Sequence, residues 1–208
     1  MKKTLFWNNE HDQQQIVAAL QNNKVIAGTS DTVIGLLANT TQQGFDSLNA
    51  TKGRSEKPYI VLIGSIAALQ HFAPQPQEPS LRQLINNCWP GPLTLILKAH
   101  ESLPSYLKSP NGTIALRMPD HAGLLDILQH FQGLFSTSAN KAGMPIANTI
   151  EDLDLAIAAS IDLIVSDLAE RIPTKPSTII DASTPNVRVI REGAYSIEEL
   201  KNICESLE

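Results

Sequence analysis

The sequence has few of the residues that usually build reactive or metal-binding sites. Two cysteines, Cys88 and Cys204, occur among 208 residues and form no C-x-x-C pair, which argues against a disulfide scaffold or a thiolate zinc site. The histidines are scattered, and we expect His121 and His130 on the solvent-exposed surface rather than in a metal site. Phosphate-loop, dinucleotide, zinc-protease and nucleophile-elbow motifs are all missing. A chemistry that depends on a cysteine or histidine nucleophile is therefore disfavoured.

Charged residues and long apolar runs are also scarce. Charged side chains make up 18% of the chain and apolar ones 42%, a balance typical of a globular protein. The net charge of −5 excludes a chain-wide field that would attract polyanions. No segment approaches the roughly 20 apolar residues that span a bilayer. We expect a cytoplasmic protein without membrane contact, folded as one domain over residues 1–208 with its core at residues 12–194 and a C-terminal helix at residues 196–206.

Helix-like and strand-like segments alternate along the chain without an internal repeat, which predicts a mixed α/β fold. A rigid turn is expected at residues 89–92, because the two prolines of this run fix φ and remove backbone donors. Helices are expected at residues 13–20, 43–51, 81–88 and 120–128, and strands at residues 25–27, 59–63, 93–98, 113–118, 161–165, 177–180 and 187–190.

Individual residues mark where some of these elements begin and end. Gly53 is expected to end the second helix in a left-handed conformation, and Asp120 is expected to cap the fourth. A further helix is predicted to start at Asn148 or Thr149. The S-x-x-E sequence from Ser196 is a capping box, which predicts a last helix directly after it.

Three cations fall within six positions at the end of the second expected helix: Lys52, Arg54 and Lys57. Cations at a helix C-terminus complement the helix dipole by a few tenths to about 1 kcal/mol, which is a sufficient structural reason for them. They also begin a loop, and loops at the ends of α/β elements commonly bind ligands. A helix-capping role and an anion-binding role both remain open.

The strand expected at residues 113–118 places a hydroxyl and a cation on one face. Side chains alternate along a strand, so Thr113, Ala115 and Arg117 share one side. A guanidinium beside a small residue suits a bound carboxylate or phosphate, which arginine can hold with two parallel hydrogen bonds. The same pattern also fits an ordinary solvent-facing strand side.

Hydroxyl-rich segments accompany two other strands. A loop predicted after residue 135 carries Ser136, Ser138 and Asn140, whose side chains and backbone N–H groups can bind phosphate oxygens. It could equally be a turn whose polar groups hydrogen-bond only to one another. Ser177 and Arg191 add a hydroxyl and a guanidinium at the edges of late strands. Together, the basic residues are expected to focus positive potential into one cleft of an acidic protein.

Taken in order, these segments resemble the YrdC-like family of threonylcarbamoyl-AMP synthases. The resemblance extends from about residue 25 to residue 194, and its specificity lies in six short runs that keep the order of the family. These runs are T-S-D-T-V-I-G-L from Thr29, K-G-R from Lys52 with Lys57-Pro58, W-P-G-P-L-T from Trp89, residues 113–119, residues 136–140 with Gly143, and Ser177-Thr178-Ile179 with Arg191-Glu192-Gly193.

The resemblance implies both a fold and a reaction. The fold is α/β, a twisted mixed sheet with flanking helices and a concave cationic cleft. The reaction joins L-threonine, bicarbonate or CO2, and ATP into threonylcarbamoyl-AMP and releases pyrophosphate, with Mg²⁺ carried by the ATP phosphates. A downstream transferase complex then modifies a tRNA adenosine, and tRNA itself is a further expected partner. Because threonine nitrogen adds to CO2 without an enzymic nucleophile, the protein need only position its reactants and neutralise their charge.

The resemblance also implies roles residue by residue. The side chains around threonine would be Thr32, Arg117, Ser136 and Ser177, with Arg117 on the α-carboxylate. The ATP-binding residues would be Lys52, Arg54, Lys57, Thr113, Ser138, Asn140 and Arg191. The residues that support the reaction by charge neutralisation would be Lys52, Arg54 and Arg117, with no dedicated metal site.

This chain departs from the family pattern at three positions. The family usually has proline and threonine at the positions of Thr29 and Ser30 and an aromatic residue at that of Ile34, which allows a shifted threonine pocket. Two other functions stay open: a non-enzymatic RNA-binding module that uses the same cleft, and a divergent paralogue that adenylates another carbamoyl substrate. A chain that ends soon after residue 194 is expected to be the short form of the family, without an extra C-terminal domain.

Overall fold

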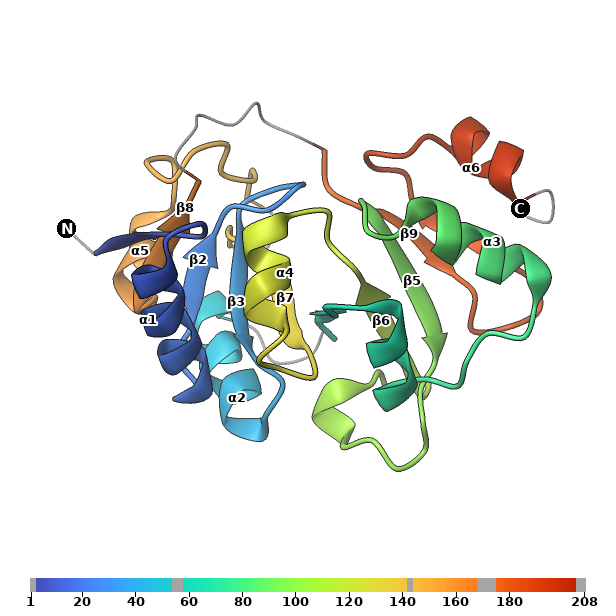
Figure 1. Cartoon of the computed structure of the whole chain (residues 1–208), viewed down its shortest axis with the longest axis horizontal. Helices are drawn as coiled ribbons and strands as arrows, with labels where there is room; N and C mark the ends of the chain where they lie inside the picture. The colour runs from blue at the N-terminus through green and yellow to red at the C-terminus, as the bar shows by residue number, and fades with distance from the viewer. Residues whose placement is uncertain (1–2, 54–57, 142–143, 168–174, 205–208) are drawn as a thin grey trace.

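Ten strands form one mixed sheet in the computed structural model, which describes residues 3–53, 58–141, 144–167 and 175–204 (Figure 1). The strand order is β1-β8-β2-β3-β7-β4-β6-β5-β9-β10. Some neighbouring strands are parallel and others are antiparallel, which confirms the predicted mixed sheet. The strands are β1 (Thr4–Phe6), β2 (Ile26–Gly28), β3 (Gly35–Asn39), β4 (Ile60–Leu62), β5 (Leu93–Lys98), β6 (Thr113–Arg117), β7 (Leu134–Ser138), β8 (Leu163–Ser166), β9 (Thr178–Asp181) and β10 (Arg188–Arg191).

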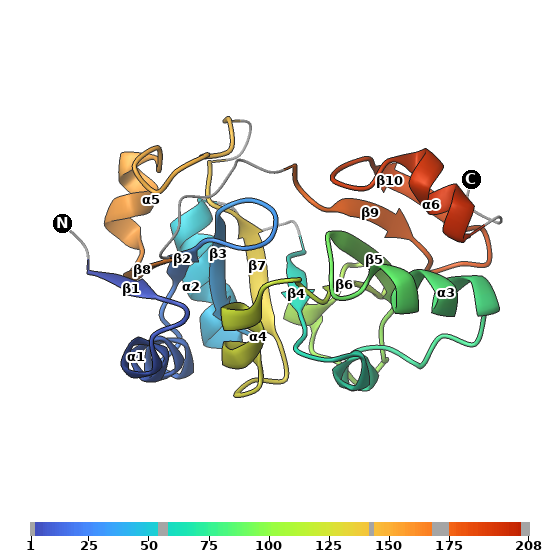
Figure 2. The same ribbon diagram turned by 45° about the horizontal axis from the view of Figure 1, so that its top comes forward.

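Helices flank the sheet in two groups. α1 (Glu10–Gln21) and α4 (Ala122–Leu128) share one apolar cluster, which also contains Leu5 and Trp7. The buried apolar side chains of the other four α-helices belong to a second, larger cluster, and Figure 2 shows α3 and α6 together beside β9. These helices are α2 (Gln42–Lys52), α3 (Pro79–Cys88), α5 (Leu155–Ser160) and α6 (Ile197–Ile203), and short 3-10 helices span Ile66–His71 and Ser105–Leu107.

Strand residues divide between the two clusters in the alternating manner of a sheet. In β2, Ile26 belongs to the cluster of α1 and α4, whereas Ala27 belongs to the larger cluster. In β3, Leu37 and Leu36 divide in the same way. Both faces of these strands are buried, so their side chains are apolar on both faces and do not alternate with polar ones.

Several predicted element boundaries are confirmed. Gly53 ends α2 with a φ of 66°, and its N–H donates to the Asn49 carbonyl. Ser196 caps α6 in a complete capping box with Glu199. Residues 89–92 form a turn that begins with a cis Trp89–Pro90 peptide bond. Local sequence signals decide these boundaries because their hydrogen bonds lie within a few residues.

Other expectations are wrong. α4 is capped by His121, not Asp120, because His121 has extended φ and ψ and its Nδ1 accepts from the Leu124 N–H. The helix predicted at residue 148 or 149 begins only at Leu155, after Asp154 as N-cap. His121 is 6% exposed, not on the surface, because Trp7 packs against its ring at 5.7 Å between centroids.

The hydroxyl-rich segment after residue 135 is not a loop. Ser136 and Ser138 lie within β7, which pairs with β3 on one side and β4 on the other. Strands β1 and β3 are present although neither was predicted. Within the described ranges, no helix is both long and apolar enough to cross a bilayer.

Candidate active site

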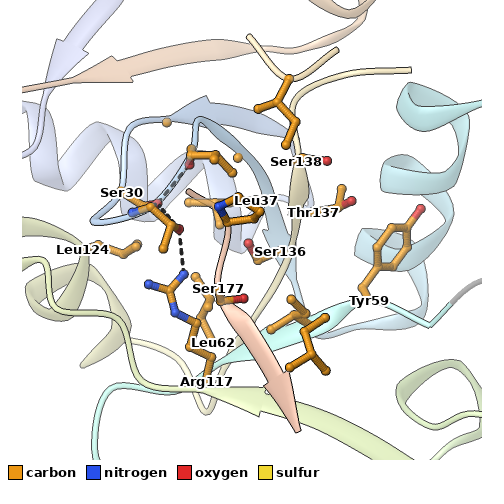
Figure 3. Close-up of a pocket in the computed structure, with 18 of the residues that line it drawn as sticks. Ser30, Leu37, Tyr59, Leu62, Arg117, Leu124, Ser136, Thr137, Ser138 and Ser177 are labelled. Atoms are coloured by element: carbon orange, nitrogen blue, oxygen red, sulfur yellow. Dashed lines mark hydrogen bonds between the residues drawn. The ribbon is translucent and has the colours of Figure 1, made fainter. Parts of the chain in front are cut away.

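A cavity of about 520 Å³ is lined by segments that are distant in the strand order (Figure 3). Its walls come from the β2–β3 connection, β4, β6, β7 and the β9–β10 hairpin. Five strands separate β3 from β10 in the sheet, so the sheet has to curve for both to reach one cavity. The described lining contains two guanidinium groups, Arg117 and Arg191, and no carboxylate. The cavity therefore suits an anionic ligand.

The β2–β3 connection, residues 29–34, supplies hydroxyl groups to one wall. Ser30 Oγ donates to the Val33 carbonyl at 2.9 Å, which uses its only proton. The 3.1 Å contact between the Ser30 and Thr32 hydroxyls is then donated by Thr32. Thr32 Oγ1 accepts in turn from Arg117 Nη1 at 2.8 Å. Internal hydrogen bonds thus fix the hydroxyl of Thr32 beside the guanidinium.

Arg117, the last residue of β6, is held by three groups. Its Nε donates to the Gly91 carbonyl at 3.0 Å, its Nη1 donates to Thr32, and its Nη2 pairs with Asp31 Oδ2. The Asp120 N–H also donates to Asp31 Oδ2, at 3.0 Å. A guanidinium has five N–H groups, so these three bonds leave two, one on each terminal nitrogen. The cation is preorganised, with donors to spare for a ligand.

Burial sets the electrostatics of this pair. Arg117 is 5% exposed, and burial lowers the pKa of its guanidinium while the charge of Asp31 opposes that shift. Asp31 Oδ1 is buried without a hydrogen-bond partner among the described residues. Because Asp31 neutralises Arg117, attraction for a carboxylate at this wall comes from oriented N–H groups rather than from net charge.

The opposite wall is made by β7, where Ser136, Thr137 and Ser138 all line the cavity. Gly35 of β3 is paired with Ser138, and a Cβ at Gly35 would lie 3.3 Å from the Thr137 carbonyl. A side chain at position 35 would therefore press against the backbone of β7. Ser138 Oγ donates to Asn140 Oδ1 at 2.6 Å, whereas the Ser136 hydroxyl bonds to nothing in the described part of the chain. Ser136 is thus available to a ligand.

A third wall combines Ser177 and Arg191. Ser177 is 4% exposed, and its hydroxyl lies 2.8 Å from that of Thr94. Arg191 donates from Nε and Nη2 to the Ser177 carbonyl, at 3.3 and 2.8 Å. Partial burial lowers the pKa of the Arg191 guanidinium. The backbone of Ser177 thus orients the second cation of the cavity.

Gly193 is required for this third wall, and Gly193→Ala tests the requirement. A Cβ there would lie 2.2 Å from the Pro176 carbonyl oxygen and 2.6 Å from the Ser177 carbonyl carbon. We expect overpacking to lower the free energy of unfolding by about 1–3 kcal/mol and to displace Ser177. Urea unfolding measures the first effect, and an unchanged midpoint would contradict the close contact.

Lys52 and Asn140 stabilise the end of β7 from outside the cavity lining. Lys52 is 5% exposed, and its ammonium donates to the carbonyls of Ser138 and Asn140 and, at 3.0 Å, to Asn140 Oδ1. Asn140 in turn donates to the Met144 carbonyl. Asn140 also lines a second cavity of about 410 Å³, formed by residues 139–141, 144–148, 152 and 154. The cation of Lys52 thus orders the chain between the two cavities.

The structure brings six of the sequence-predicted site residues together in the first cavity: Thr32, Arg117, Ser136, Ser138, Ser177 and Arg191. Lys52 and Asn140 adjoin this set through Ser138. Thr113 is not in the lining, and its hydroxyl lies 2.8 Å from that of Ser109. Arg54 and Lys57 lie outside the described residues.

Two features of the site were not predicted from the sequence. Asp31 pairs with the central guanidinium, and the available signal was a lone carboxylate in a loop otherwise rich in hydroxyls. Tyr59 lines the cavity, and its hydroxyl donates to Asn49 Oδ1 at 2.8 Å. By contrast, Ile34 is buried in the larger apolar cluster and does not line the cavity, so its side chain affects the core rather than a ligand.

The donor set of the cavity fits an anion better than a resident metal ion. Hydroxyls and guanidinium groups donate to carboxylate or phosphate, whereas Mg²⁺ requires oxygen ligands such as carboxylates. The described ranges contain no group of three or more His, Cys, Asp or Glu side chains that could hold a metal.

Comparison with known proteins places the chain among proteins of related sequence. The profile of the Sua5/YciO/YrdC family, described as "Telomere recombination", matches residues 18–193. The threonylcarbamoyl-AMP synthase of Mus musculus is 31% identical over 198 residues, covering 91% of this chain and 69% of the mouse protein. The threonylcarbamoyl-AMP synthase of Yersinia enterocolitica is 29% identical over 175 residues, covering 81% of this chain and 90% of that protein.

A solved structure gives the same result at the level of the fold. The crystal structure of P. abyssi Sua5 complexed with L-threonine superimposes with a TM-score of 0.89 at 25% identity. The match covers 100% of this chain and 62% of the P. abyssi chain. The present chain therefore spans less than two thirds of that protein.

Proposed function

The chain belongs to the Sua5/YciO/YrdC family, and we propose that it is a threonylcarbamoyl-AMP synthase. The reaction joins L-threonine, bicarbonate or CO2, and ATP, and releases pyrophosphate. The observation that carries the proposal is the cavity that Arg117, Arg191 and the hydroxyls of β7 line together, with no carboxylate in the described lining. The similarity to a Sua5 structure that contains L-threonine supports the choice of amino acid.

Threonine would bind at the Arg117 end of the cavity. The two N–H groups of Arg117 that have no partner among the described residues would take the α-carboxylate, and the Ser136 hydroxyl, which also has no partner there, would add a further bond. Thr32 and Ser177 would complete the walls around the side chain. The amino group would then point toward the open part of the cavity, where CO2 can reach it.

Chemistry at this site requires positioning rather than a protein nucleophile. The threonine nitrogen forms a bond to the carbon of CO2 and loses a proton to solvent, which gives a carbamate. A carbamate oxygen attacks the α-phosphorus of ATP, and the bond to the bridging oxygen breaks, so that pyrophosphate leaves. Guanidinium and hydroxyl donors stabilise the charge that develops on the phosphate oxygens. Holding three reactants together supplies much of the rate enhancement.

The ATP side of the cavity would be formed by Ser138 and Arg191, together with Arg54 and Lys57, which lie outside the described residues. We place Lys52 and Asn140 in the same group because they hold Ser138 and the chain that follows it. Mg²⁺ would be carried by the phosphate oxygens, and its role is to neutralise their charge.

Other proposed residues and partners follow from the family. The Thr113 hydroxyl would have to break its hydrogen bond with Ser109 to bind the nucleotide. The product is a mixed anhydride, so an acyl transferase complex has to consume it, with a tRNA adenosine as the acceptor.

The reaction itself is tested with isotopically labelled bicarbonate. We expect purified protein with L-threonine, ¹³C-bicarbonate and Mg-ATP to release pyrophosphate and to form a threonylcarbamoyl-AMP that carries the label in mass spectra. Omitting threonine should abolish both signals. Threonine-independent release of pyrophosphate, or an unlabelled adenylate, would show that the protein performs another reaction.

The preference for threonine separates this function from that of a paralogue with another substrate. L-Serine lacks one methyl group, whose burial is worth about 1 kcal/mol, so calorimetry should show a several-fold weaker affinity for serine than for threonine. Equal affinity for both amino acids would favour the paralogue. Binding of RNA without any effect of threonine would favour an RNA-binding module instead.

A further inference from the structure

Four side chains form a hydrogen-bonded chain at the first residue of the β2–β3 connection. Trp7 Nε1 donates to Thr29 Oγ1 at 3.0 Å, and the Thr29 hydroxyl donates to Asp167 Oδ2 at 2.7 Å. The other carboxylate oxygen, Asp167 Oδ1, lies 3.0 Å from His121 Nε2. We call these four residues the Trp7–His121 network. It joins the segments that follow β1, β2, β8 and β6.

The positions of the protons in this network follow from its partners. His121 Nδ1 accepts from the Leu124 N–H at 3.1 Å and therefore carries no proton. The proton of the neutral ring is then on Nε2 and is donated to Asp167. Thr29 Oγ1 both accepts from Trp7 and donates to Asp167. The donor and the acceptor of each hydrogen bond are therefore defined, which favours one arrangement of the four side chains.

Tight packing fixes the same network sterically. Trp7 is 1% exposed, and a Cβ added at Gly28 would lie 2.5 Å from its ring. A Cβ added at Gly123 would lie 2.4 Å from Trp7 Cβ. The two glycines therefore leave the space that the tryptophan occupies between β2 and α4. Rotation of the indole away from Thr29 is blocked by this packing.

The network holds the first residue of the connection, and Arg117 holds its middle. Thr29 is fixed by the network, whereas Asp31 and Thr32 are fixed by Arg117. The adjacent residues Asp120 and His121 reach both attachments, since the Asp120 N–H donates to Asp31 and His121 contacts Asp167. Residues 120–121 thus join the attachment at Thr29 to the attachment at Asp31.

Thr29 lines the cavity, but its hydroxyl already bonds to Trp7 and Asp167. Its contribution to ligand binding is therefore the placement of the backbone that follows it. We infer that the Trp7–His121 network positions residues 29–34, and that His121 is a positioning residue for the amino-acid substrate although it does not line the cavity. The identity of the ligand rests on the proposed function. The inference that the network keeps residues 29–34 ordered does not rest on it.

His121→Asn separates positioning from folding. Asparagine is a good N-cap and can still accept from the Leu124 N–H, but its shorter side chain cannot reach Asp167. His130→Asn is the matched control, because His130 is exposed and lies just beyond the same helix. Thr29→Val and Thr29→Ser form a second pair, in which only serine retains the hydroxyl.

Two measurements are made on each variant: amide hydrogen exchange at residues 29–34 and the calorimetric Kd for L-threonine. For His121→Asn and Thr29→Val we expect exchange to accelerate and Kd to rise by about tenfold, because a displaced wall positions its ligand groups less well. His130→Asn should leave both values unchanged. Thr29→Ser, which retains the hydroxyl, should keep the exchange rate and the Kd close to their wild-type values.

The two readouts distinguish the network from the proposed function. Unchanged exchange at residues 29–34 in His121→Asn would overturn the inference, as would a uniform acceleration of all amides, which indicates lost global stability only. If the wild-type protein binds no threonine, the proposed function fails, and the exchange data still decide whether the network orders the connection.

Discussion

Arg117→Ala is expected to weaken L-threonine binding by about a hundredfold and to lower the free energy of unfolding by about 3–5 kcal/mol. The ligand loses charge-assisted hydrogen bonds from the guanidinium. The protein loses the partner of Asp31, whose Oδ1 already has no partner among the described residues. Calorimetry with threonine measures the first effect and urea unfolding the second.

A double variant separates these two effects. In Arg117→Met with Asp31→Asn, both charges are removed, while the amide oxygen can still accept from the Asp120 N–H. Replacing both members of a buried ion pair is often nearly neutral for stability, so we expect the fold to recover and threonine binding to stay weak. A double variant that binds threonine like the wild type would show that the guanidinium is not the carboxylate clamp.

Lys52→Met is expected to lower the free energy of unfolding by about 2–4 kcal/mol and to weaken Mg-ATP binding. The ammonium of Lys52 donates to Ser138 and Asn140 in a site where the lysine is 5% exposed, and methionine would leave these acceptors unsatisfied. Because the same bonds order the end of β7, ATP affinity should fall together with stability. Thermal unfolding with and without Mg-ATP measures both effects.

Lys24→Met provides the matched control. The Lys24 side chain is 53% exposed, and its ammonium lies 3.8 Å from Asp162. An exposed ion pair of this kind contributes about 0–1 kcal/mol. If Lys52→Met were no more destabilising than Lys24→Met, the contacts of Lys52 with β7 would not support the wall of the cavity.

The sequence predicts elements well where their signals are local. The strand expected at residues 93–98 is β5 at Leu93–Lys98, and the caps at Gly53 and Ser196 are as predicted. Strand β3 was missed because its buried residues lie in both apolar clusters and show no alternation of polarity. Strand β1 was missed because it has three residues and pairs with β8, far along the chain.

The candidate site could likewise be predicted only in part. The types and order of its residues, such as Arg117 and Ser136, are visible in the sequence. Their hydrogen bonds are not, because Asp31 and Arg117 are 86 positions apart and meet only once the sheet has formed. His121 shows the limit most clearly: a lone histidine before a helix is usually exposed, and only the packing of Trp7 and Asp167 buries it.

A crystal structure of the protein with L-threonine would show directly whether Arg117 binds the carboxylate of the amino acid. We expect the α-carboxylate to lie within about 3.2 Å of the terminal nitrogens of Arg117, with Ser136 as a further donor and the amino group directed toward the open part of the cavity. Threonine bound in another cavity, or with its carboxylate turned away from Arg117, would overturn the proposed role of Arg117 as the carboxylate clamp.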